Sequence, residues 1–147
     1  MTALENSLEK SYIWLNTLQS KLNTPKREDA YRLLKVVLHE LRDRLPITEA
    51  AQLGAQLPTL IRGLYYEGFR PRPTTLNRKD KSLQPFLRAV EKKMPRFYPK
   101  PPSELLRATF ETLNDFIAPG EIEDIKACCS KELKDFWPSP SKRKKAA

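Results

Sequence analysis

The sequence offers few side chains that could carry out catalysis. Its one histidine, His39, lies four residues before Asp43, a spacing that puts both residues on one face of a helix. Such a pair could bind a metal ion together or act in acid–base chemistry. A metal site needs three or four ligands, however, and the chain has no second histidine and no isolated cysteine. We therefore interpret His39 as a solvated residue beside an apolar stripe.

The two cysteines, Cys128 and Cys129, are adjacent, and a disulfide between neighbours would force a strained ring. We expect reduced, mostly buried thiols. The chain has only four glycines and contains no glycine-rich phosphate loop, nucleophile elbow or Cys-X-X-Cys pair. The sequence predicts no catalytic residue, no cofactor and no metal site. An enzyme or a small-ligand carrier of unknown type stays as an alternative.

Several arginines and tyrosines suit partner recognition, in which both residue types are over-represented. The candidate interaction surface comprises Arg42, Arg44, Gln56, Arg62, Gly63, Tyr66 and Glu67. The alternative interpretation places Arg42 and Arg44 on a solvated helix face and Tyr65 in the core. Both interpretations are kept at this point.

The net charge of +9, from 27 basic and 18 acidic residues, is compatible with nucleic-acid binding through phosphate contacts. The candidate contacts are Arg70, Arg72, Arg78, Lys142, Arg143, Lys144 and Lys145. No aromatic residue interleaves with the charges of the C-terminal segment to stack on bases. We therefore favour the alternative, in which residues 138–147 are a disordered basic tail that aids solubility.

The thirteen prolines fall between segments whose apolar residues have helical periodicity. One such segment has a wide apolar stripe: Ala30, Leu33, Leu34, Val37, Leu38, Leu41 and Leu45. No segment alternates apolar and polar residues as a half-buried strand does. The sequence predicts an all-α protein, a bundle of about six to eight helices. It has no apolar run long enough to cross a membrane and no visible signal peptide, so we expect a cytoplasmic protein with no membrane partner.

The two halves of the chain have similar patterns. Residues 14–65 align with residues 86–137 at a shift of 72 without a gap. The alignment places apolar positions on apolar positions and gives eight identical pairs, one of which is Glu49 and Glu121. We interpret this as an internal duplication. The expected organisation is a single helical domain, 1–137, with a first repeat at about 1–65, a linker at 66–82 and a second repeat at about 83–137.

The shift also aligns Asp43 with Asp115, each near the C-terminal end of an expected helix, where the helix dipole disfavours an acid. The repetition suggests a local structural role. Our hypothesis is that these residues cap the helices that begin near Thr48 and Gly120.

The span LHELRDRLPITEAAQLGAQLPTLIRGLYYEGF, residues 38–69, closely resembles the signature of a bacterial and archaeal family known as domain of unknown function 2267 (DUF2267). WLNTL, Ala30-Tyr31 and GEIEDIKACCSKELKDFWP also resemble its pattern, so the resemblance covers nearly the whole chain apart from the basic tail. Members carry Leu-Pro before the last short helix, where this chain has Cys129-Ser130, and Ser130 can itself cap a helix. The resemblance implies an all-helical cytoplasmic protein with no established activity, and it supplies no catalytic residues.

The leading functional hypothesis is a non-enzymatic helical module that binds another protein or forms a homo-oligomer. A weak, nonspecific nucleic-acid binder that uses the basic candidates named above is the first alternative.

Overall fold

The computed structural model describes residues 1–71, 80–95 and 98–140. Within these ranges the chain forms α-helices and no strand. The helices are α1 (Ala3–Leu22), α2 (Arg27–Arg42), α3 (Ile47–Ala55), α4 (Thr59–Tyr66), α5 (Leu83–Lys93), α6 (Pro102–Phe116), α7 (Pro119–Ala127) and α8 (Lys131–Phe136). The predicted all-α bundle of six to eight helices is confirmed. None of the described helices is both long and apolar enough to cross a membrane.

Local sequence signals set several helix starts. Thr2 and Glu5 form a reciprocal capping box at the start of α1. Proline occupies the first turn of α6 and of α7, where its missing N–H costs no helical hydrogen bond. Ser130 accepts a hydrogen bond from the Leu133 N–H and so caps α8, as expected from its place in the sequence.

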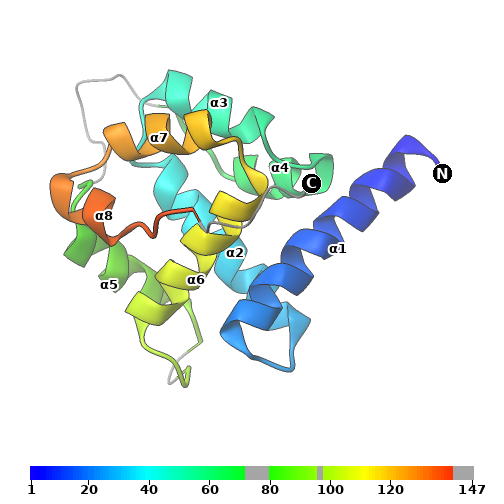
Figure 1. Cartoon of the computed structure of the whole chain (residues 1–147), viewed down its shortest axis with the longest axis horizontal. Coiled ribbons are helices and arrows are strands. Elements are labelled where there is room, and N and C mark those ends of the chain that lie inside the picture. The colour runs from blue at the N-terminus through cyan, green and yellow to red at the C-terminus, as the bar shows by residue number, and fades with distance from the viewer. Residues whose placement is uncertain (72–79, 96–97, 141–147) are drawn as a thin grey trace.

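Helices of one half pack on helices of the other half as well as on each other. In the bundle α1 packs on α6 and α5 packs on α2, while α2 meets α6 and α3 meets α7 (Figure 1). Helices α3 and α7 begin and end 72 residues apart, and so do the starts of α4 and α8. This arrangement is the one expected for two similar halves around a pseudo-two-fold axis. The internal duplication itself stays a prediction.

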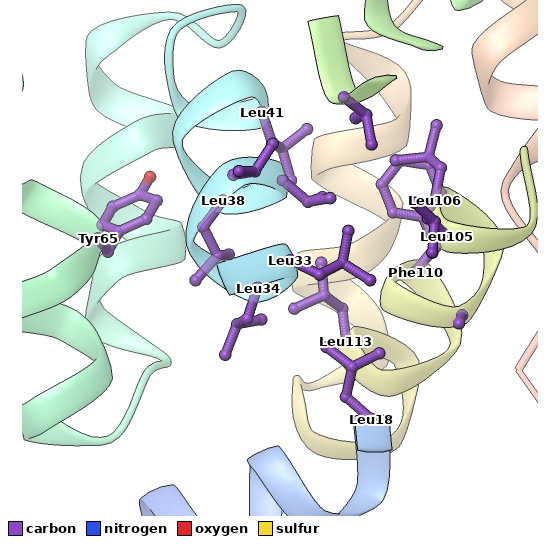
Figure 2. Packing of buried hydrophobic residues seen from close by; sticks show 14 of the residues in the cluster. Leu18, Leu33, Leu34, Leu38, Leu41, Tyr65, Leu105, Leu106, Phe110 and Leu113 are labelled. Carbon is purple, nitrogen blue, oxygen red and sulfur yellow. The ribbon is translucent and has the colours of Figure 1, made fainter. Parts of the chain in front are cut away.

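The core lies between α2 and α6 (Figure 2). Leucines of α2 interlock with side chains of α6, and Leu18 of α1 covers one end of this layer. The ring of Phe110 stacks on Trp137, with centroids 3.7 Å apart. Tyr65 is buried on the other side of α2, where its hydroxyl donates to the Ala50 carbonyl at 2.6 Å.

The capping hypothesis for the two repeated aspartates is wrong. No side chain caps the N-terminal end of α3 or of α7. Asp43 instead pairs with Arg42, its neighbour in the chain, and Asp115 pairs with Lys21 of α1. Each aspartate thus meets a cation that offsets its unfavourable place near the end of a helix.

Candidate functional site

Arg42, predicted as part of an exposed surface, is 4 % exposed and ties α2 to the end of α4. Its Nη1 donates to the carbonyl oxygens of Tyr65 at 2.6 Å and Glu67 at 2.9 Å. Carbonyls at the C-terminal end of a helix lack intrahelical donors, and a cation suits the negative end of the helix dipole. Arg42 therefore serves as an internal cap for α4.

Arg44 is buried as well, in a charged cluster that joins the two halves. Its Nη1 donates to Glu40 Oε1 at 2.7 Å, and its Nε donates to the Asp80 carbonyl at 2.8 Å. Lys93 of α5 bonds the second oxygen of Glu40, which is fully buried. The expectation that Arg42 and Arg44 lie on a surface, whether as partner contacts or on a solvated face, is wrong. The expected burial of Tyr65 is confirmed.

His39 is half-buried and has a structural partner. Its Nε2 lies 2.8 Å from the Leu64 carbonyl oxygen, which can only accept, so Nε2 carries the hydrogen. Burial lowers the pKa of His39, and the neutral ring is favoured. The histidine thus joins α2 to α4, in contrast to the solvated position expected for it.

The adjacent cysteines are half-buried and form no disulfide. Burial raises the pKa of Cys129 to about 11, so its sulfur stays a thiol at neutral pH. Its Sγ donates to the Ile125 carbonyl at 3.4 Å. A protonated, internally bonded sulfur is a poor nucleophile and a poor metal ligand.

Two further surface candidates hold α3 against α4. Arg62 donates to the carbonyls of Gly54 at 2.9 Å and Leu57 at 2.8 Å, at the C-terminal end of α3. The ring of Tyr66 lies so close to Gly54 that a Cβ there would come within 2.5 Å of the Tyr66 hydroxyl. Gly54 therefore allows the close approach of the tyrosine, and both Arg62 and Tyr66 have structural partners.

The remaining interaction candidates are exposed. Gln56 accepts a hydrogen bond from the Ala118 N–H at 3.3 Å, and Glu67 pairs with Lys35 at 3.3 Å. Gly63 faces open space on α4. Of the nucleic-acid candidates, Arg70 is described and exposed, whereas Arg72, Arg78, Lys142, Arg143, Lys144 and Lys145 lie outside the described residues.

The structure brings together two glutamates that the sequence reasoning did not select. Glu49 of α3 and Glu121 of α7 are equivalent in the two halves and meet where these helices cross. One carboxylate oxygen from each, and one from Asp124, lie within 4.8 Å of one another. The Oε2 atoms of both glutamates are buried, and neither accepts a hydrogen bond from a described donor. The only signal in the sequence was their identity under the 72-residue shift.

Burial and the closeness of two like charges favour a protonated carboxyl in this pair. Burial, followed by the contact with Glu49, raises the pKa of Glu121 to about 7. Two carboxyls this close favour a state in which one proton serves both. Oxygen ligands also suit Ca²⁺ or Mg²⁺, but three carboxylates alone would leave most of the coordination sphere to water. Proton sharing accounts for the arrangement without a ligand.

An apolar groove of about 570 Å³ lies over α1, α2 and α4. Its walls are formed mainly by large apolar side chains: Leu8, Tyr12, Leu15, Tyr31, Leu60 and Leu64. Four of these are exposed by about two-fifths, namely Leu8, Tyr12, Tyr31 and Leu60. At Gly63 a side chain would meet nothing within 4 Å, so the groove is open there. Contiguous exposed apolar surface of this kind marks interaction sites.

The groove borders a helical extension of α1 that the second half lacks, and Leu8 of this extension lines it. Under the 72-residue shift Leu83, the first residue of α5, is equivalent to Ser11. Residues 3–10 of α1 are therefore additional, and they form the N-terminal end of the long helix, where Ser7 meets the start of α4 (Figure 1). This extension carries Leu4, which is 69 % exposed.

A family described as "Uncharacterized conserved protein (DUF2267)" matches residues 11–136. The chain belongs to the DUF2267 family. No curated protein matches the chain. The DUF2267 match begins at Ser11, the residue that the 72-residue shift places on Leu83 at the start of α5. The α1 extension, residues 3–10, thus lies outside the DUF2267 match, and Leu8 is its residue that lines the apolar groove.

Proposed function

We propose that this protein is a helical interaction module that seats an amphipathic helix in the groove over α1, α2 and α4. The observation that carries the proposal is the apolar stripe of α1, which continues past the bundle without a cover. Leu15, Leu18 and Leu22 of this stripe are buried in the core, whereas Leu4 and Leu8 extend the same stripe into solvent.

The shape and chemistry of the groove support a helical occupant. A helix that docks in a groove presents aliphatic anchors three or four residues apart, which matches the spacing of Leu8, Tyr12 and Leu15 along one wall. The polar flanks are already satisfied: Ser11 Oγ donates to the Ser7 carbonyl at 2.9 Å, and Ser7 Oγ accepts from the Leu60 N–H at 3.2 Å. Covering the groove would therefore strand few polar groups.

A matched pair of variants tests the proposal. Leu60→Glu places a charge in the groove, whereas Ile47→Glu changes an equally exposed residue on α3, outside the groove (42 % and 41 %). We expect Leu60→Glu to abolish recovery of any protein, including a second copy, that the tagged chain retains in the native host. Ile47→Glu should leave recovery unchanged. Equal recovery with both folded variants, judged by circular dichroism, would reject the groove as the binding surface.

The nucleic-acid hypothesis stays a prediction, since Arg70 alone among its contacts is described. Salt-independent binding, or no binding, of a DNA duplex would exclude it.

A further inference from the structure

Three exposed residues of α1 are placed symmetrically along its outer part. Leu4, Leu8 and Tyr12 follow one another at intervals of four residues, so they form one stripe with Leu8 at its centre. Their exposed fractions are 69, 43 and 41 %. Leu8 and Tyr12 line the groove, and Leu4 continues the stripe beyond it.

This spacing makes the stripe complementary to itself. When two such helices run antiparallel about a two-fold axis at Leu8, Leu4 of one helix faces Tyr12 of the other, and Leu8 faces Leu8. A closed two-fold interface requires a surface of this kind, because each patch must fit its own copy.

We propose that the occupant of the groove is the outer part of α1 from a second copy of this chain. Two copies then form an antiparallel α1 pair about a two-fold axis at Leu8. This inference rests on the proposed function and adds the identity of the docked helix.

The charges beside the stripe favour the same arrangement. The guanidinium of Arg27 lies over the Tyr12 ring, 4.4 Å from its centroid. Glu5 follows Leu4 in the sequence, so Glu5 of the second copy would approach Arg27 when Leu4 meets Tyr12. An acid on the docking helix thus meets a cation at the groove rim.

The extension is also prepared for docking. The Glu5 N–H donates to Thr2 Oγ1 at 3.1 Å, and the Thr2 N–H donates to Glu5 Oε1 at 2.9 Å. This capping box stabilises the first turn of α1 beyond the bundle. A helix that is already formed loses less conformational freedom on binding than a disordered segment does.

Sedimentation velocity of the untagged full-length chain, at concentrations from about 1 to about 100 µM, tests the proposal. We expect a dimer whose dissociation constant rises about tenfold or more in Leu8→Glu, since the charge enters the interface twice. Ile13→Glu is the matched control on the same helix, because Ile13 is 47 % exposed but lines a different groove with Trp14. It should dimerise as the parent does.

Thiol cross-linking tests the antiparallel geometry in a Cys128→Ser, Cys129→Ser background. Leu8→Cys lies on the proposed axis and should cross-link efficiently with a short bifunctional reagent. Asn16→Cys lies eight residues away, so its two copies would be about 24 Å apart along the pair and should not react. Efficient cross-linking at both positions would indicate a parallel pair and overturn the arrangement.

The outcomes separate this inference from the proposed function. A chain that stays monomeric up to about 100 µM, or a dimer equally stable in Leu8→Glu and Ile13→Glu, overturns the second copy as occupant. If Leu60→Glu still loses a different retained protein that Ile47→Glu keeps, the groove function stands with another helix in it. If Leu8→Glu leaves dimerisation unchanged and Leu60→Glu leaves the recovery of retained proteins unchanged, both proposals fail.

Discussion

The two halves of the bundle perform the same structural tasks with different chemistry. In the first half, Arg42 closes the end of α4 by donating to two backbone carbonyls. At the equivalent position of the second half, Asn114 donates to the Pro138 carbonyl after α8 and accepts from Trp137 Nε1. Trp137 itself is equivalent to Tyr65. Both residues thus bond backbone carbonyls at or just after the last helix of their half, Arg42 with a charged group and Asn114 with a neutral one.

Two features of the first half have no counterpart in the second: a buried charged residue and the additional turns of α1. The buried acid Glu40 has no counterpart in the second half, because the equivalent residue Thr112 is buried and bonds its own helix at the Ala108 carbonyl. The α1 extension also belongs to the first half. A functional role beyond packing is therefore best sought at these unmatched features.

The largest effect is expected at the unmatched charged cluster. Arg44→Ala leaves Glu40 buried with one cation fewer and frees the Asp80 carbonyl, so it should cost about 3–5 kcal/mol in the free energy of unfolding. Urea denaturation measures this loss. A cost below about 1 kcal/mol would mean that the remaining partners of Glu40, Lys93 among them, compensate the carboxylate.

The two caps should differ in cost although they are equivalent in position. Arg42→Ala removes charged hydrogen bonds and should lower the free energy of unfolding by about 3 kcal/mol. Asn114→Ala removes neutral bonds and should cost about 1–2 kcal/mol. Equal losses of unfolding free energy, measured under the same denaturant conditions, would contradict the view that the charged cap stabilises its half more than the neutral cap does.

The close approach of α3 and α4 has no counterpart in the second half, where Lys126 and Pro138 replace Gly54 and Tyr66. Gly54→Ala drives a methyl group into the Tyr66 ring and should lower the free energy of unfolding by about 1–3 kcal/mol. Gly63→Ala is the control, since that glycine is helical and faces open space. It should stabilise the chain by about 0.5–1 kcal/mol through helix propensity. Stabilisation by both substitutions, seen in thermal melts, would show that Tyr66 moves aside freely.

The smallest effect concerns Glu49 and Glu121, an identical pair of residues that meets at the junction of the halves. The folded-state pKa of Glu121, about 7, lies above its ordinary value of 4.5, so the folded chain binds more protons than the unfolded chain between these values. Stability should therefore fall as pH rises through this window and level off above it. Glu121→Gln should remove that slope and stabilise the chain at pH 8 by about 1 kcal/mol, allowing for solvent screening.

Differences between variants isolate this effect, because the lowered pKa of His39 gives an opposite slope below its ordinary value of 6.5. Glu123→Gln, on the exposed side of the same helix, is the control and should keep the slope of the parent. A slope unchanged in Glu121→Gln would refute the shared proton.

The helices and the core could be predicted from the sequence because they depend on periodicity and on local start signals. Stripes such as Leu33–Leu41 and caps such as Ser130 act within a few residues. The burial of Arg42 and Arg44 could not be predicted, because each also donates to a backbone carbonyl more than twenty residues away in the chain. A cation adjacent to a leucine stripe is ordinarily solvent-exposed.

The candidate sites show the same limit. Tyr66, Arg62 and Gln56 were recognised as unusual residues, but their partners depend on how α3, α4 and α7 meet. Glu49 and Glu121 were recognised as identical, although only the crossing of α3 with α7 places them in contact. The exposure of Leu4 and Leu8 could not be read from the stripe, since Leu15 and Leu18 continue the same pattern into the core.

The ties around Glu40 have a consequence for how the native chain opens. Separating α5 from α2 would strip Lys93 from a buried carboxylate, so α5 cannot open alone at low cost and its amide hydrogens should exchange with solvent only when the whole bundle unfolds. The outer turns of α1 are fastened to the bundle chiefly where Ser7 meets Leu60, and their amides should exchange fastest among the described helices. Two helices that occupy equivalent positions would thus lie near opposite ends of the scale of local opening energies.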